Sequence, residues 1–296
     1  MGYMTDKGGH PMQRIMLATD FSERSDRALR RAVLLARAHG ARVELVHVVD
    51  DDRPRSIVEQ DTKQARHLLS ELARTLETLD GVACDTKVLL TDPFAGLTRA
   101  VEQTNPDLLV IGPHRRQLLR DAFVGTTAER TIRSVSCPVL MVNGTPVGDY
   151  RHVLLTTDLS DNSRLALRVF ETLNIGREGN LSVLSVFNAP ALRLAMSGTL
   201  PTTNKEDYLK SLRAEAKREL AAFIAKLGGT KAEQIVRFDE TTIAHEVQRA
   251  AKDLKSDLIV LSTQGKGAVS RMLLGSVTEQ VLRTATVDVL AIPPFK

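Results

Sequence analysis

The sequence predicts an α/β protein made of two repeated domains, each a doubly wound, parallel sheet of five strands with helices on both faces. One observation is a repeat: "LATDFSERSDRALR" (17–30) and "LTTDLSDNSRLALR" (155–168) share eight of fourteen residues at an offset of 138. A second is that "GTTAERTIRSVSCPVLMV" (125–142) parallels "GSVTEQVLRTATVDVLAI" (275–292) at an offset of 150. A third is that apolar runs alternate with helical patterns inside each copy. Together these indicate an internal duplication of a βα unit.

Each copy opens with a short apolar run, "RIMLAT" or "HVLLTT", which predicts a buried first strand. An aspartate follows the run, and then a serine, Ser22 or Ser160, that is placed to cap the next helix. The second run is apolar throughout, as is typical of a strand covered on both sides. The second strand and the long helix after it are expected at 43–49 and 57–79 in the first copy, and at 181–187 and 207–227 in the second.

The rest of each copy predicts a third strand ("TKVLL" or "QIVRF"), a helix, a fourth strand ("DLLVIG" or "DLIVLS"), a helix and a closing strand ("PVLMV" or "DVLAI"). Right-handed crossovers bring the carboxyl ends of parallel strands to one edge of the sheet, where ligands bind. Gly and Pro in "NGTPVGD" (143–149) mark a linker, so the domains are expected at 1–146 and 150–296. The two offsets differ by twelve residues, which predicts a long loop at 188–204.

The composition suits a protein with two ordinary domains: 296 residues, 43% hydrophobic and 26% charged. Two cysteines, Cys84 and Cys137, indicate a reducing compartment, and both are expected before their strands as buried, unreactive thiols. Neither a leader nor a membrane span is recognisable, so a cytoplasmic location is expected. The net charge is +4, but the basic residues are interleaved with acidic ones along the chain. Aromatic side chains on which bases could stack are few, with no Trp and three Tyr, so nucleic acid is not expected as a partner.

The segment "QGKGAVSRMLLGS" (264–276) follows the predicted fourth strand of the second copy, and Gly275 and Ser276 begin the last helix. Unpaired N–H groups and the dipole at a helix start stabilise a phosphate, and glycine lets the anion approach them. Lys266 and Arg271 add positive charge, and Asp158 on the same edge can accept hydrogen bonds from a nucleoside. The alternative stays open that the glycines only turn the chain and the aspartate only caps a helix.

These features resemble the universal stress protein family in its tandem, two-domain form, and the resemblance covers nearly the whole chain. Nucleotide-binding members carry GxxGx9G[ST] after the fourth strand. The second copy matches this motif except at its first glycine, with Ser262, Gly265, Gly275 and Ser276, and "LLGSVTEQVL" is similar to the family's usual sequence there.

The first copy departs from the family motif at the second glycine, where Arg115 stands. A β-carbon and a long side chain at a position that demands open backbone would obstruct the approach of a phosphate. This loop is also strongly basic, with Arg115, Arg116 and Arg120. Two interpretations of the basic loop stay open: a site for a different anionic ligand, and a solvated basic face.

The resemblance implies an adenine nucleotide alpha hydrolase-like fold and a site for ATP, with magnesium, chiefly in the second copy. Adenosine would be held by an aspartate and a backbone group late in the second strand, and glycines and helix-start residues would hold ribose and phosphates, with the small Ser262 permitting their approach. In the second copy these positions are Asp158, Val186, Ser262, Gly265, Gly275, Ser276 and Val277. In the first copy the weaker set is Asp20, Val48, Gly112, Gly125 and Thr126.

A metal site from His47, His114 and Asp20 is a further possibility, but no short-spaced His or Cys pair supports it, and a packed or hydrogen-bonded histidine is favoured. Hydrolase motifs such as GxSxG and HExxH are missing from the sequence, so we expect a nucleotide-responsive binding protein with at most slow ATP hydrolysis. The alternative function is a nucleotide-independent scaffold whose loop at 188–204 meets a protein or another small anionic or apolar ligand.

The closing strands are apolar and would each form a sheet edge unless something pairs with them. Single-domain relatives dimerise through this strand, so the resemblance implies that the two copies pair internally about a pseudo-two-fold axis. Whether the tandem chain also forms a homodimer stays open.

Overall fold

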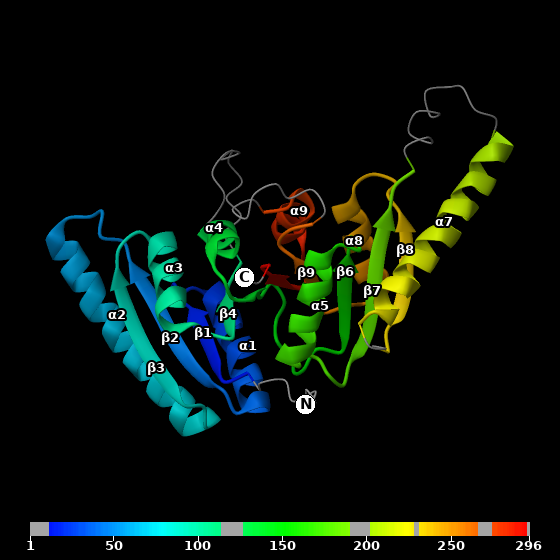
Figure 1. The fold of residues 1–296 in the computed structure, drawn as a ribbon. Coiled ribbons are helices and arrows are strands. Elements are labelled where there is room, and N and C mark those ends of the chain that lie inside the picture. Colours follow the sequence, from blue (N-terminus) through cyan, green and yellow to red (C-terminus); the bar gives the residue numbers. More distant parts are fainter. Residues whose placement is uncertain (1–11, 114–126, 190–201, 228–230, 266–273, 295–296) are drawn as a thin grey trace, which may run out of the picture.

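The computed structural model describes residues 12–113, 127–189, 202–227, 231–265 and 274–294. In the described residues ten strands form one sheet in the order β3-β2-β1-β4-β5-β10-β9-β6-β7-β8 (Figure 1). The first lobe comprises β1 (Arg14–Ala18), α1 (Glu23–His39), β2 (Arg42–Val49), α2 (Arg55–Thr75), the π-helical η1 (Leu76–Asp80), β3 (Cys84–Leu90), α3 (Pro93–Thr104), β4 (Leu108–Ile111), α4 (Thr127–Ser134) and β5 (Val139–Met141). The second lobe comprises β6 (His152–Thr157), α5 (Asp161–Leu173), β7 (Asn180–Phe187), α7 (Thr202–Ala225), β8 (Glu233–Phe238), α8 (Ile243–Asp253), β9 (Leu258–Ser262), α9 (Ser276–Thr284) and β10 (Asp288–Ile292).

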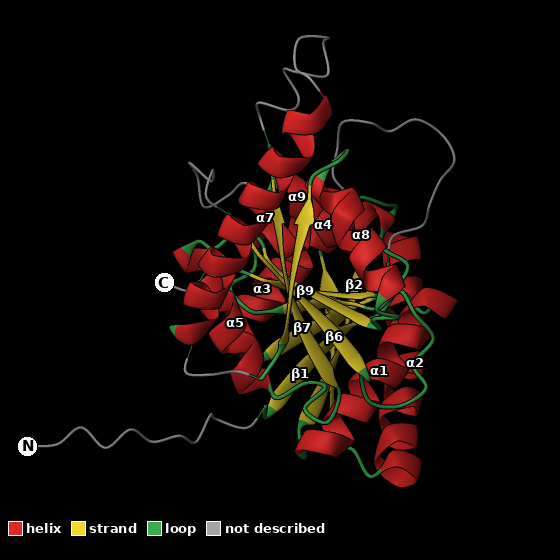
Figure 2. Cartoon of the chain, turned by 90° about the vertical axis from the view of Figure 1, so that its right-hand side faces the viewer, coloured by secondary structure: helices red, strands yellow, loops and turns green. Residues whose placement is uncertain are grey.

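Within each lobe the strands are parallel and helices lie on both sides of them, which confirms the predicted doubly wound fold (Figure 2). Alternate residues of a strand face opposite layers: Leu17 belongs to one apolar cluster and Met16 to the other. Every residue of β4 is buried, as a strand covered on both faces requires. Core formation therefore follows directly from the apolar runs seen in the sequence.

The two serines predicted as helix caps differ in what their hydroxyls do. Ser160 is the N-cap of α5, and its Oγ accepts a hydrogen bond from the Ser163 N–H at 3.2 Å. Ser22 occupies the same place before α1 but makes no side-chain cap, and its hydroxyl donates to Asp20. The prediction is thus confirmed for Ser160, whereas the neighbouring carboxylate takes the hydroxyl of Ser22.

The lobes are joined through their closing strands, as the resemblance implied. Strand β10 pairs antiparallel with β5, with Leu290 opposite Leu140. Because each lobe covers the exposed edge of the other, the two half-sheets become one continuous sheet.

A buried polar network beside this junction joins the lobes and the linker. Asp288 Oδ2 accepts a hydrogen bond from the Tyr150 hydroxyl at 2.6 Å and lies 3.3 Å from Arg31 Nε, and Oδ1 accepts from the N–H groups of Asn143 and Gly144, both at 2.9 Å. The side chains of Arg31 and Asp288 are only 7% and 2% exposed. Burial raises the pKa of Asp288, although the Tyr150 hydroxyl, the two N–H groups and Arg31 act in the opposite direction.

A second interlobe ion pair connects α9 with α4. Arg283 Nε lies 3.0 Å from Oε1 of Glu129, a side chain that is almost fully buried. The same guanidinium contacts Glu279 on its own helix at 2.8 Å. Helices from both lobes are therefore tied at the junction by charge as well as by the strand pair.

The structure corrects two details of the sequence interpretation. Cys84 is the first residue of β3 instead of preceding it, and it is half-buried; Cys137 precedes β5 and is buried, as predicted. Helix α7 begins at residue 202, so the end of the loop expected at 188–204 is helical; residues 190–201 lie outside the described part. Among the described residues, none of the helices has the length and apolar character that crossing a bilayer demands.

Candidate functional site

Each lobe has a cavity at the carboxyl edge of its strands, and the cavity of the second lobe measures about 490 Å³. It lies between the ends of β6, β7 and β9 and the first turn of α9. All seven residues predicted for the second lobe line it: Asp158, Val186, Ser262, Gly265, Gly275, Ser276 and Val277. Parallel topology brings these residues together from four separate segments, as the sequence analysis expected.

Asp158 and Gly265 are matched to each other sterically. The Oδ1 atom of Asp158 accepts a hydrogen bond from the Ser160 N–H at 3.0 Å. A β-carbon on residue 265 would lie 2.5 Å from the Oδ2 atom of Asp158. Only glycine therefore lets the loop after β9 pass over this carboxylate without displacing it.

Gly275 is the N-cap of α9, with φ −61° and ψ 141°, a conformation open to any residue. A β-carbon there would meet nothing nearer than the Thr263 carbonyl oxygen at 3.5 Å, an ordinary contact. The first bond of the helix runs from the Glu279 N–H to the Gly275 carbonyl at 2.9 Å, so the N–H groups of residues 276–278 precede the helical ladder. In the described residues, neither backbone strain nor crowding accounts for a glycine at this helix start.

Ser262 uses its hydroxyl within the loop. It donates to the carbonyl oxygen of Gln264 at 2.8 Å, while the Ser262 carbonyl accepts from the hydroxyl of Thr278 at 2.9 Å. These two bonds fix the turn after β9 against the first turn of α9. The serine that replaces the family's first glycine thus braces the loop, a role that the sequence analysis did not foresee.

The other side of the second-lobe cavity is apolar. Leu184 and Val186 come from β7, Leu261 comes from β9, and Ile243 and Val247 come from α8. Such a wall suits one face of a flat aromatic ring. The two α8 residues were not predicted, because in sequence they belong to an ordinary amphipathic helix, and Ile243 is 36% exposed.

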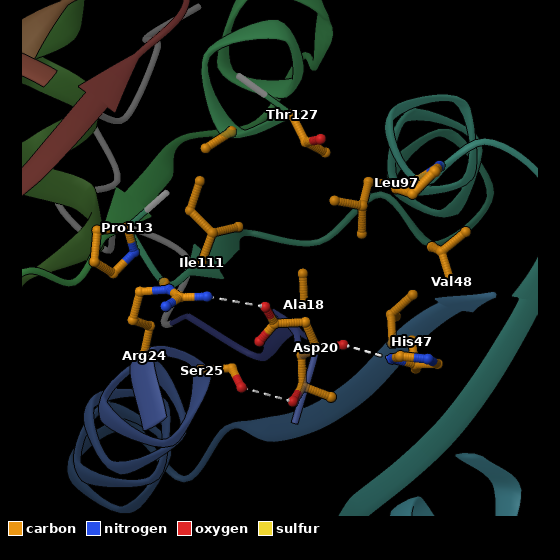
Figure 3. Close-up of a pocket in the computed structure, with 15 residues that line it drawn as sticks. Ala18, Asp20, Arg24, Ser25, His47, Val48, Leu97, Ile111, Pro113 and Thr127 are labelled. Atoms are coloured by element: carbon orange, nitrogen blue, oxygen red, sulfur yellow. Dashed lines mark hydrogen bonds and ion pairs between the residues drawn. The ribbon is translucent and has the colours of Figure 1, made fainter. Parts of the chain in front are cut away.

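The cavity of the first lobe is smaller, about 330 Å³ (Figure 3). Of the residues predicted there, Asp20, Val48 and Gly112 line it. The remaining predictions for this loop lie outside the described residues, namely Gly125, Thr126, His114 and Arg115, as do Lys266 and Arg271 of the second lobe.

Charges in the first-lobe cavity are paired within the protein. The Arg24 guanidinium forms an ion pair with Asp20 (Figure 3), with Nη2 at 3.6 Å from Oδ2. The N–H and hydroxyl of Ser22 donate to Oδ1 of the same carboxylate. Burial raises the pKa of Asp20, but the hydrogen bonds from Ser22 and the charge of Arg24 outweigh it, and the pKa lies below its ordinary value.

Gly112 has a packing role in the first lobe. A β-carbon on it would lie 2.9 Å from the carbonyl carbon and oxygen of Arg24 in α1. The glycine that matched the nucleotide motif is thus needed for the first turn of α1 to lie against the end of β4.

His47 is held by local contacts. Its Nδ1 lies 2.8 Å from the Thr19 carbonyl oxygen, and its ring centroid lies 4.6 Å from that of Phe21. The described part of the chain holds no cluster of three His, Cys, Asp or Glu side chains able to bind a metal. The contacts of His47 with Thr19 and Phe21 are those of the packed histidine favoured above, and the metal site stays a sequence hypothesis because His114 lies outside the described residues.

Two similar α/β lobes, each with a cavity where an aspartate after the first strand faces the last helix of the lobe, define a duplicated α/β protein with one candidate site per lobe. The model of the universal stress protein family matches residues 11–143 and 149–293, and the chain belongs to that family. It is 22% identical to universal stress protein E of Escherichia coli K12 over 300 residues, 95% of this chain and 94% of the relative. It is 26% identical to the universal stress protein E homolog of Haemophilus influenzae over 216 residues, 68% and 66% of the two chains. A universal stress protein from Archaeoglobus fulgidus has the same fold, with a TM-score of 0.66, 19% identity and coverage of 95% of this chain and 98% of that one.

Proposed function

We propose that this universal stress protein binds ATP or a related adenine nucleotide, chiefly in the cavity of the second lobe. In this proposal it acts in the cytoplasm as a nucleotide-responsive binding or signalling module, with domains at 1–146 and 150–296. The observation that carries the proposal is Gly275, a glycine at a helix start that neither strain nor packing against the described residues requires. Close approach of an anion to the N–H groups of α9 supplies the missing reason.

The lining residues suggest how such a ligand would lie. Asp158 and the backbone at Val186 would hold adenosine against the apolar wall of the cavity. Gly265, Gly275 and the N–H groups of Ser276 and Val277 would hold ribose and phosphates, where the helix dipole favours negative charge. Magnesium would enter bound to those phosphates, since it keeps most of its water and takes few protein ligands.

Binding without rapid turnover fits the chemistry of the cavity. Among its described lining residues Asp158 is the one ionisable side chain, and it lies where the nucleoside is proposed to bind. A base that orients water for attack on a phosphate would have to stand at the other end, near α9. We therefore propose a binding protein in which any ATP hydrolysis is slow.

Calorimetry with magnesium and ATP tests the proposal on the intact chain and on Gly275→Val. The variant places a branched side chain in front of the α9 N–H groups and should abolish the single expected site. Gly144→Val is a matched control, because a β-carbon at this linker glycine also meets its nearest atom at 3.5 Å. The control should bind like the intact chain. An intact chain that binds no nucleotide would sink the proposal and favour the scaffold alternative.

A further inference from the structure

One cavity position differs between the lobes in a way that bears on ligand choice. In the repeat, Asn162 of α5 is the residue equivalent to Arg24 of α1. Arg24 lines the first-lobe cavity, whereas Asn162 does not line the second. The cavity with the arginine is the smaller, about 330 Å³ against about 490 Å³.

Arg24 acts on the aspartate that the proposed function assigns to the nucleoside. Its guanidinium lies 3.6 Å from Asp20 Oδ2, and Ser22 donates twice to Oδ1. Arginine carries donors and no acceptor, so a nucleoside hydroxyl or amino group that approaches Asp20 meets competing donors. In the second lobe the corresponding carboxylate, Asp158, has an asparagine four residues later.

The backbone holds Arg24 in this place. Its carbonyl group lies so close to Gly112 that a β-carbon there would be 2.9 Å from it, so the first turn of α1 packs directly on the end of β4. The side chain of Arg24 is 30% exposed and that of Asp20 is 64% exposed, so the arginine is the more enclosed member of the pair. The guanidinium is therefore part of the cavity wall.

We propose that Arg24 is a specificity-determining residue that closes the first lobe to the nucleotide, and that Asn162 keeps the second lobe open. The inference rests on the proposed function of the second lobe. It makes the lobes unequal through a described side chain, independently of the loop that carries Arg115.

The deciding experiment places the arginine in the second lobe. Asn162→Arg in the full chain should weaken binding of magnesium ATP by at least tenfold in calorimetry. Leu165→Arg is the matched control, because it adds the same charge one turn later on α5, at a side chain that is 41% exposed and does not line the cavity. The control should bind like the intact chain, and both variants should show a single unfolding transition near that of the intact chain.

Arg24→Asn combined with Arg115→Gly is the reciprocal variant and keeps the inference testable should Asn162→Arg fail to fold. Because Arg115 is also expected to obstruct a phosphate, Arg115→Gly alone should leave the stoichiometry at one ATP per chain, and the double variant should raise it to two. Asn162→Arg binding as tightly as the intact chain, or Arg115→Gly and the double variant showing the same stoichiometry, would overturn the inference alone. An intact chain that binds no ATP would overturn it together with the proposed function.

Discussion

Replacing Asp288 by alanine should destabilise the protein strongly, because this side chain connects the two lobes and the linker. The change removes the acceptor of the Tyr150 hydroxyl and of two backbone N–H groups. It also leaves Arg31, whose side chain is only 7% exposed, without its carboxylate. Breaking a buried pair from one side costs about 3–5 kcal/mol. Arg31 keeps its hydrogen bond to the Gly148 carbonyl at 2.6 Å, which favours the lower half of that range.

The assay is equilibrium unfolding in urea, followed by circular dichroism, on Asp288→Ala, Arg31→Met and the double variant. The pKa of Asp288 is raised because the effect of its desolvation exceeds that of its hydrogen bonds and of the Arg31 charge. Removing both charges together leaves neither one buried and unpaired, so the double variant should lose less stability than the sum of the single variants. A loss below about 1 kcal/mol for Asp288→Ala, or strict additivity in the double variant, would refute the reasoning.

Two further predictions concern thiols and pH. Burial raises the pKa of Cys84 and of Cys137 to about 12 each, so the native thiolate population at pH 8 falls roughly a thousandfold; iodoacetamide should label both cysteines only after denaturation, and rapid labelling of the native chain would contradict this. Because the pKa of Asp20 is lowered in the folded state, ionised Asp20 stabilises the fold at pH values above the ordinary pKa of 3.8. This contribution is lost as the pH falls through the folded pKa. Because Asp20 is 64% exposed, Asp20→Asn should cost under about 1 kcal/mol at pH 7 and nothing measurable at pH 2, in urea titrations at both values. The pH dependence that Asp288 contributes has the opposite sign, since its raised pKa lets the folded state take up a proton before the unfolded state on acidification. For Asp20→Asn, equal losses of stability at both pH values would rule the assignment out.

The fold could be predicted from the sequence because its determinants are local or repeated. Apolar runs mark the strands, and the duplication assigns each element a counterpart. The pairing of β5 with β10 follows once each lobe is seen to end in an apolar edge. The seven residues around the second cavity follow from parallel topology and the family motif.

What could not be predicted depends on contacts between distant segments. Gly112 matches the motif in sequence, but its packing against α1 appears only when the helix is placed. The direction of the Ser262 hydroxyl depends on the turn at Gln264. Arg31 and Asp288 are far apart in sequence, and the repeat places Val169 and Pro138 at their counterparts, so no pattern links them.

The pair of Arg31 and Asp288 has no equivalent at the corresponding positions of the repeat, so it makes the two lobes structurally different. Two first lobes joined through their closing strands would set Arg31 opposite Pro138, and two second lobes would set Asp288 opposite Val169. Either arrangement would bury a charge with no counter-charge, which is costly. The two halves of the chain are therefore not interchangeable, because replacing one half by a copy of the other would leave a buried charge unpaired.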